Sequence, residues 1–176
     1  RNPVAPYQHV RKIAEDIAAP ELLLQQGAII RSLDLACLGA AGLSDVKVNI
    51  PPKVCFIPTG TELVKIGETP GPGQIIEFNS IFLSALVEDW GAEASVRNPV
   101  SDDPTLLEQA LLHSIIDCDI LVVIAGSSAG SEDFTSSVMA KLGEVIVHGV
   151  AIRPGHPVIL GSVSGKPVIG MPGYPS

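Results

Sequence analysis

The stretch Asp119-Ile-Leu-Val-Val-Ile-Ala-Gly-Ser-Ser-Ala-Gly-Ser-Glu-Asp-Phe134 combines an aliphatic run with a turn of glycine and serine. Six residues, 120–125, show no alternation of apolar and polar side chains, which is typical of a parallel-sheet strand covered on both faces. Open α/β sheets bind ligands in loops at the carboxyl ends of such strands. The small side chains expose backbone N–H groups, and a helix follows. The stretch therefore predicts a pocket for an anion or a phosphate.

Strands and helices alternate on both sides of this stretch. We expect strands at 53–57, 94–100 and 120–125, helices at 79–90, from 104 onward and at 134–142, and three closing extended runs at 145–152, 158–160 and 167–171. The closing runs have no long helix between them, which favours an antiparallel edge. The alternation predicts a three-layer α/β/α domain with a mostly parallel sheet over residues 53–176. Pro51-Pro52 separates it from a small helical and extended linker, residues 1–52, which includes part of an N-terminal domain.

Helix signals within these elements are specific at a few positions. Ser32 is the expected N-cap and Gly42 the expected stop of a helix at 32–41. Asp103-Pro104 opens the next-to-last helix, with aspartate as cap and proline at the first helical position. The helical spacing predicts two buried faces, one of Leu107, Leu111 and Ile115 and one of Leu83, Leu86, Val87 and Trp90.

Length and composition limit the classes of protein to consider. The chain has 176 residues, 46% of them hydrophobic, and a net charge of −8, which fits one α/β core with an appendage. The acidic balance argues against a nucleic-acid partner, which requires a basic patch. No apolar run is long enough to cross a membrane and no signal peptide is recognisable, so we expect a cytoplasmic enzyme. The abrupt ends suggest a piece of a longer chain.

The three cysteines carry no metal signal. They are far apart and form no C-x-x-C pair, so a zinc site is not expected. Cys55 and Cys118 lie within or beside apolar runs, which predicts reduced thiols in the core.

Acidic, hydroxyl and glycine residues follow four of the expected strands. The four loops are Thr59-Gly-Thr-Glu62, Ser101-Asp-Asp103, Gly126 to Asp133, and Pro172-Gly173. In a parallel sheet these carboxyl ends converge on one edge. Carboxylates beside an anion-binding loop suggest a shared divalent cation. Mg²⁺ is the expected ion, because it binds one or two carboxylates together with ligand phosphates.

Structural roles compete with functional ones at several of these positions. Capping alone explains Asp103, so Asp102 is the more informative member of the pair. Asp133 directly precedes the expected helix at 134–142, and there capping and function weigh equally. Arg153-Pro-Gly-His-Pro157 places a guanidinium and an imidazole around a turn, and arginine binds phosphates or oxyanions bidentately.

Gly126-Ser-Ser-Ala-Gly130 also fits the G-x-S-x-G pattern of α/β hydrolases, with Ser128 as the nucleophile. Asp133 and either His148 or His156 follow in the required order. The expected helix, however, begins about five residues after Ser128, too late for a nucleophile elbow. A serine hydrolase therefore remains an outside alternative.

The same loops, taken in order, resemble one family. Five segments carry the resemblance: Thr59-Gly-Thr-Glu-Leu63 with Pro72-Gly-Gln-Ile75 and Asn79; Asp102-Asp-Pro104; Asp119 to Asp133; Ile152-Arg-Pro-Gly-His-Pro157; and Gly170-Met-Pro-Gly-Tyr-Pro175. Together they are similar to the MoeA-type molybdopterin molybdenumtransferases, whose catalytic domain resembles the MogA-type molybdopterin adenylyltransferases. Five motifs in order are specific, although each one is modest.

The resemblance implies a reaction and a set of site residues. Molybdate is inserted into the dithiolene of adenylylated molybdopterin, and the adenylate is released. The implied acidic groups are Glu62, Asp102 and Asp133, with Asp102 and Asp133 at the metal, and Arg153 and His156 facing the anion. The implied ligand-binding residues are Thr59, Gly60, Thr61, the loop of Gly126, Ser127, Ser128, Gly130 and Ser131, and the lip formed by Pro172, Gly173 and Tyr174.

The chain departs from the family pattern at several of these positions. Arg153 and His156 stand where lysines are frequent, Thr61 replaces an acidic residue, and Tyr174 replaces an asparagine. The oxyanion stays open between molybdate and tungstate. The alternatives are a molybdopterin adenylyltransferase and a non-catalytic carrier of molybdopterin or nucleotide. The resemblance further implies a homodimer in the full-length protein, an adenylyltransferase partner, and a fragment that binds better than it turns over.

Overall fold

The computed structural model describes residues 3–124, 131–151 and 157–173, and for residues 131–133 it describes the backbone alone. The chain divides into two compact units, residues 1–49 and 50–176. The first unit contains α1 (Ser32–Ala40), which begins one residue after its N-cap. That N-cap is Arg31, not Ser32 as expected, and Asp34 accepts a hydrogen bond from its backbone N–H at 2.8 Å. Gly42 follows the C-cap with a φ of 78°, as a helix stop requires.

The second unit contains a six-stranded sheet in the order β4-β1-β5-β8-β7-β6 among the described residues. The strands are β1 (Lys53–Pro58), β4 (Glu93–Val96), β5 (Ile120–Ile124), β6 (Gly143–His148), β7 (Ile159–Val163) and β8 (Lys166–Met171). β4, β1, β5 and β8 are parallel to one another. β7 is antiparallel to β8, and β6 is antiparallel to β7. The mostly parallel sheet and its antiparallel edge are confirmed.

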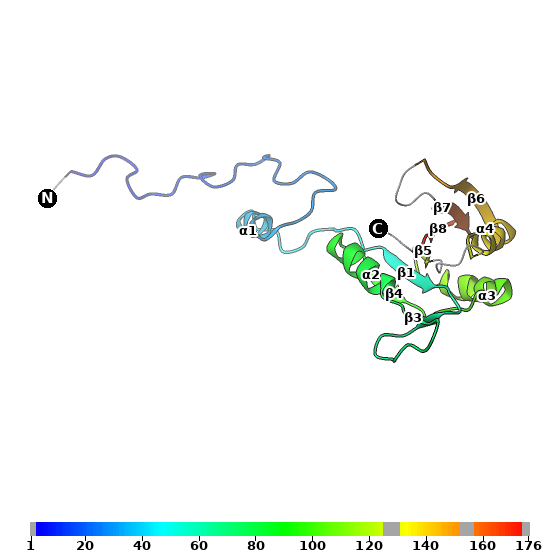
Figure 1. Ribbon diagram of the computed structural model, residues 1–176. Helices are drawn as coiled ribbons and strands as arrows, with labels where there is room; N and C mark the ends of the chain where they lie inside the picture. Colours follow the sequence, from blue (N-terminus) through cyan, green and yellow to red (C-terminus); the bar gives the residue numbers. More distant parts are fainter. Residues whose placement is uncertain (1–2, 125–130, 152–156, 174–176) are drawn as a thin grey trace. The chain divides into compact units, whose positions relative to one another are not determined.

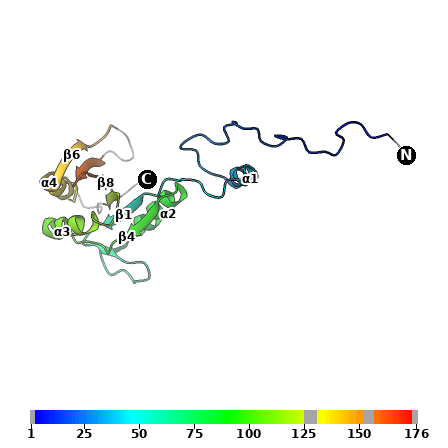
Figure 2. The same cartoon turned by 180° about the vertical axis from the view of Figure 1, so that it is seen from behind.

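Helices cover both faces of this sheet (Figure 1). α2 (Asn79–Asp89) packs over one face, on a cluster that includes Val54, Phe56 and Leu83. α3 (Pro104–Ser114) and α4 (Ser131–Leu142) pack over the other, on a cluster that includes Cys55 and Leu111. Figure 2, seen from behind, again shows α3 and α4 together and apart from α2. Successive residues of β1 belong to opposite clusters, Val54 and Phe56 to the one under α2 and Cys55 to the one under α3 and α4. The architecture is therefore three-layer α/β/α. None of the described helices is long and apolar enough to cross a membrane.

Several side chains lie where the helical spacing predicts and one does not. Leu107, Leu111 and Ile115 are buried, as are the free thiols of Cys55 and Cys118. Trp90 is 74% exposed, so its expected place in the buried face of α2 is wrong. Trp90 is the C-cap residue of α2, and the chain turns at Gly91 with a φ of 86°. The tryptophan thus lies past the last turn that packs on the sheet.

The expected strand at 94–100 is shorter than predicted. β4 covers Glu93–Val96, and Val100 forms only an isolated parallel bridge with Thr59. The Pro/Gly-rich loop after β1 contains a short parallel pair that the sequence did not predict, β2 (Leu63–Val64) with β3 (Ile75–Ile76).

α4 begins at Ser131, three residues earlier than predicted. Asp133 therefore lies in the first turn of the helix, and the expected N-cap role is wrong. The residues Ser-Glu-Asp form the first turn of α4 and do not precede the helix. A carboxylate in this turn is compatible with the helix dipole. The late helix start that argued against a nucleophile elbow at Ser128 is also wrong.

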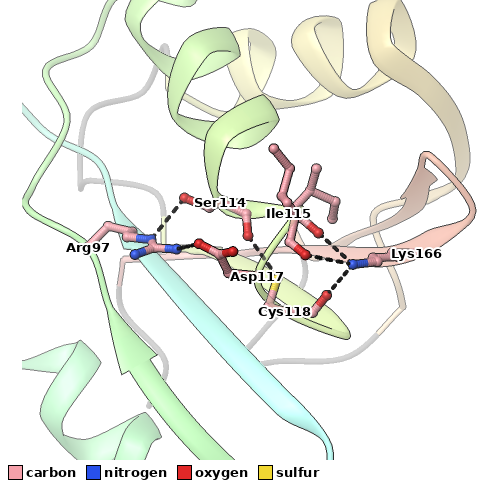
Figure 3. A network of polar contacts seen from close by, with 7 residues as sticks. Arg97, Ser114, Ile115, Asp117, Cys118 and Lys166 are labelled. Atoms are coloured by element: carbon pink, nitrogen blue, oxygen red, sulfur yellow. Dashed lines mark hydrogen bonds and ion pairs between the residues drawn. The ribbon is translucent and has the colours of Figure 1, made fainter.

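The connection from α3 to β5 is held by two cations (Figure 3). Lys166, at the start of β8, donates to the carbonyls of Ile115, Ile116 and Cys118 at 2.7, 3.3 and 2.7 Å. Arg97 donates to Ser114 Oγ at 3.1 Å and to Asp117 Oδ2 at 3.4 Å. Carbonyls at a helix C-terminus lack intrahelical hydrogen-bond donors, and the Lys166 ammonium group donates to them instead.

Replacing Lys166 with methionine is expected to lower the free energy of unfolding by about 2–4 kcal/mol, because half-buried carbonyls lose a charged donor. Urea unfolding measures the change. Lys65→Met is the matched control, since the Lys65 side chain is exposed in the same unit. Equal losses in the two variants would show that the Lys166 contacts contribute no stability.

Candidate functional site

The carboxyl ends of β1 and β5 are joined by Thr59. Its backbone N–H and its hydroxyl both donate to the carbonyl of Ile124, at 2.7 and 3.1 Å. The residue is 4% exposed. Thr59 was expected to bind ligand, and the structure places its hydroxyl in a contact between two strands. Gly60 continues the loop, and its N–H donates to the Val100 carbonyl at 2.9 Å.

Glu62 folds back over Gly60. A Cβ on Gly60 would lie 2.9 Å from Glu62 Oε2 and 2.9 Å from Leu63 Cγ, and the φ of Gly60 is +151°. A side chain at position 60 would therefore displace the carboxylate and strain the backbone. The carbonyl of Glu62 accepts a hydrogen bond from the Ile75 N–H at 3.0 Å, which ties this residue to β3. The main chain of Glu62 is thus tied to β3, and its carboxylate lies next to Gly60, at the edge where β1 ends.

The two neighbouring aspartates have different contacts. Asp103 Oδ1 accepts from the N–H groups of Thr105 and Leu106, at 2.7 and 3.1 Å, and so caps α3 as predicted. Asp102 instead pairs with Thr61. The Thr61 N–H donates to Asp102 Oδ2 at 3.2 Å, and the Asp102 N–H donates to Thr61 Oγ1 at 3.2 Å. This reciprocal pair joins the loop after β1 to the loop before α3.

Capping lowers the pKa of the Asp103 carboxyl below its ordinary value of 3.8, chiefly through the hydrogen bond from the Leu106 N–H and then that from Thr105. A carboxyl with a lowered folded-state pKa stabilises the fold above its unfolded pKa. This contribution disappears as the pH falls through the folded-state value.

Replacing Asp103 with alanine is expected to lower the midpoint of thermal unfolding at neutral pH by about 2–5 °C. The difference from the unaltered chain should shrink as the pH falls below 3.8, because the native cap is then being protonated. Calorimetric scans from neutral pH down to about pH 2 test this. A difference that stays constant across the range would contradict the capping role of the ionised carboxylate.

A small pocket connects these loops with the beginning of α4. Its lining includes Thr59, Ser101 and Asp102 on one side and Phe134 and Thr135 on the other. Thr135 is 1% exposed and Phe134 40%. The first turns of α4, which include Asp133, therefore lie beside the loop of Asp102. Glu62, Asp102 and the backbone at Asp133 come from three different strand ends, and the fold brings these loops to one edge.

The donor set of this edge fits a metal that a ligand shares. Within the described residues, no group of three or more His, Cys, Asp or Glu side chains could hold a metal ion. Asp102 offers one carboxylate, and Asp133, whose side chain is not described, lies on the neighbouring turn. Mg²⁺ binds one or two carboxylates together with phosphates, so a shared ion suits this edge and a cage made of protein ligands alone does not.

Asn79 also lies at this edge. It belongs to the first segment of the resemblance, but no role was predicted for it. Its Nδ2 donates to the carbonyl of Gly173 at 2.7 Å, which links the first turn of α2 to the lip after β8. Its Oδ1 is buried and has no hydrogen-bond partner among the residues that the structure describes. Pro172 and Gly173 are both half-buried. The one signal for this contact in the sequence is an asparagine at the start of a helix, together with a proline-glycine loop.

The remaining expected site residues lie outside the described part of the chain. These are Gly126, Ser127, Ser128 and Gly130 of the loop after β5, Arg153 and His156 of the next turn, and Tyr174 of the lip. For Ser131 and Asp133 the structure gives the position in α4 without the side chain.

The described residues define an α/β domain in which the loops of Glu62 and Asp102 meet the first turns of α4 at the carboxyl ends of the parallel strands, where open α/β sheets bind ligands. Residues 55–176 match the family described as the probable molybdopterin binding domain, and the chain belongs to this family. The assignment, and not the position of a helix start, argues against the serine hydrolase.

Relatives and solved structures agree with the assignment. The chain is 32% identical to the molybdopterin molybdenumtransferase of Haemophilus influenzae over 97% of its own length and 42% of the relative's. It is 34% identical to molybdopterin molybdenumtransferase 2 of Mycobacterium tuberculosis, over 99% and 45% of the two chains. The crystal structure of a MoeA protein from Pyrococcus horikoshii matches with 38% identity and a TM-score of 0.79, over 87% and 38%.

The resemblance to MoeA-type proteins is confirmed, and the chain spans less than half the length of these relatives. Molybdenum cofactor biosynthesis protein B is similar in fold alone, with 19% identity and a TM-score of 0.53. Its match over 73% of this chain agrees with the α/β architecture described above.

Proposed function

We propose that this chain forms the ligand site of a molybdenum-inserting enzyme. The two dithiolene sulfurs of adenylylated molybdopterin bind the molybdenum of molybdate, and one molybdate oxygen leaves with their protons as water. Water then cleaves the phosphoanhydride bond and releases the adenylate. One observation carries the proposal: Glu62 and Asp102 lie in loops joined at the edge next to the first turn of α4, in a chain of the molybdopterin-binding family. The names of the relatives support the same reaction class.

Each acidic group has a separate role in this proposal. Asp102, in the loop before α3, and Asp133, in the first turn of α4, would together hold a Mg²⁺ ion. Glu62, fixed over Gly60, accepts a proton or orients a water beside them. When bound, the ion neutralises phosphoryl charge at the adenylate. Arg153 and His156 bind the oxyanion, for which molybdate is the first candidate.

The loops around the acids position the pterin ligand. Residues 126–131, with their small side chains and the N-terminus of α4, bind the phosphate or pyrophosphate. The lip of Pro172, Gly173 and Tyr174 covers the ring system, and the Asn79 contact fixes the lip at Gly173. We further propose that the full-length protein is a cytoplasmic homodimer that receives its substrate from an adenylyltransferase.

Asp133→Asn tests the proposal against its alternatives. In the full-length protein, an insertion enzyme should lose turnover by about 100-fold or more, since this carboxylate would hold the ion that acts on the adenylate. Its affinity for molybdopterin should change only a few-fold, because molybdopterin carries no adenylate. Turnover is followed as adenylate release in the presence of molybdate and Mg²⁺, and affinity by calorimetry. A carrier would show only the affinity change, and an adenylyltransferase would consume ATP without any response to molybdate. Either result would overturn the insertion reaction.

A further inference from the structure

Thr61 and Asp102 form a closed pair between two loops that are 41 residues apart in the chain. Each residue donates its main-chain N–H to the side chain of the other, at 3.2 Å in both directions. Thr61 is exposed and Asp102 is half-buried. A single exposed hydrogen bond leaves a carboxylate free to change rotamer, whereas two bonds that close a ring restrain both its main chain and its side chain.

The pair leaves one part of the carboxylate for a ligand. Asp102 Oδ2 accepts the Thr61 N–H, and among the described residues no hydrogen bond engages Asp102 Oδ1. The neighbouring Asp103 carboxylate caps α3, since its Oδ1 accepts from the Thr105 and Leu106 N–H groups. The Asp102 carboxylate also lines the pocket that reaches α4. The Thr61 N–H donates to Asp102, and the Thr61 hydroxyl oxygen accepts from the Asp102 N–H.

We infer that Thr61 is a positioning residue: its hydroxyl accepts the Asp102 N–H and holds that main chain, which leaves Asp102 Oδ1 for a divalent cation that this loop would bind. This inference rests on the proposed function, because it takes Asp102 as a metal ligand. It assigns Thr61 a role different from the ligand contact expected from sequence. Outer-shell partners of metal ligands typically change metal affinity by about 10- to 100-fold when removed.

The test compares Thr61→Val, which keeps the β-branched shape and the N–H but loses the hydroxyl, with Thr61→Ser, which keeps both polar groups. Mn²⁺ in the presence of adenylylated molybdopterin serves as the probe, because the ion is shared with the ligand, and its binding to the chain is measured by electron paramagnetic resonance. We expect Thr61→Val to weaken Mn²⁺ binding about tenfold and Thr61→Ser to stay within about twofold. Thr69→Val, in the exposed part of the same loop, is the matched control and should bind as the unaltered chain does.

A second readout isolates the positioning effect from metal chemistry. The ¹⁵N order parameter of the Asp102 N–H should fall in Thr61→Val below the rigid-backbone value of about 0.85 and be restored in Thr61→Ser. Unchanged Mn²⁺ affinity in Thr61→Val, together with lost affinity in Asp102→Asn, would overturn the positioning role and leave the proposed function intact. An unaltered chain that does not bind Mn²⁺ would overturn both.

Discussion

Asp102→Asn is expected to weaken Mg²⁺ binding in the ligand complex by about 100-fold or more, and turnover of the full-length protein with it. Even outer-shell partners of metal sites cost about 10- to 100-fold, so a direct ligand should cost at least as much. Asparagine keeps the size of the side chain and an oxygen that can accept the Thr61 N–H. The loss would therefore come from the charge. Calorimetric titration of Mg²⁺ with ligand present measures the effect.

Asp103→Asn is the matched control, because it removes the same charge one residue away. Asparagine is as good an N-cap as aspartate, so the hydrogen bonds to Thr105 and Leu106 can persist. We expect Mg²⁺ affinity to change by less than about threefold, since Coulomb effects of exposed charges are weak in water. Equal losses in Asp102→Asn and Asp103→Asn would mean that general electrostatics, and not a bond to Asp102, controls the metal.

Gly161→Ala is expected to destabilise the second unit by about 3 kcal/mol or more. Gly161 is buried on β7, and a Cβ there would lie 2.3 Å from the Glu144 carbonyl oxygen and 2.9 Å from Met139 Cε. The first atom belongs to the backbone of β6 and the second to a fully buried core side chain, so neither can move cheaply. Separation of β6 from β7 would follow, and urea unfolding followed by circular dichroism measures the loss.

Gly71→Ala provides the comparison for this substitution. The nearest atom to a Cβ at that position is Oε1 of the exposed Gln74 side chain, at 3.2 Å, which can shift. We expect a change of less than about 0.5 kcal/mol. If Gly161→Ala is as stable as Gly71→Ala, the close approach of β6 to β7 is not as the structure describes it.

Local signals predicted the parts of the fold whose causes are local. The unbroken aliphatic run before Ala125 predicted a buried parallel strand, and β5 is one. Asp103 followed by Pro104 predicted a capped helix, because the cap acts on N–H groups two and three residues away. The absence of helices among the last three runs predicted the antiparallel edge formed by β6 and β7.

Features that depend on residues far apart in the chain were not predicted from the sequence. Helical spacing placed Trp90 on the buried face of α2, but the spacing does not tell where the sheet ends. The residues Ser-Glu-Asp do not by themselves show that α4 begins at Ser131, because the start of the helix depends on the surroundings of its first turn. The pairing of Thr61 with Asp102 requires β1 and β4 to end side by side, and that of Asn79 with Gly173 requires the start of α2 to meet the loop after β8. The sequence predicts a set of site residues, whereas the contacts of Thr61, Asp102 and Asn79 are visible only in the structure.

Calorimetric binding of adenylylated molybdopterin, with and without Mg²⁺ and molybdate, tests the central claim most directly. The proposed site predicts binding that requires Mg²⁺ and becomes tighter when molybdate is added, because cation, phosphate and oxyanion meet at one sheet edge. Absence of binding in the presence of Mg²⁺, or binding that neither Mg²⁺ nor molybdate changes, would contradict it.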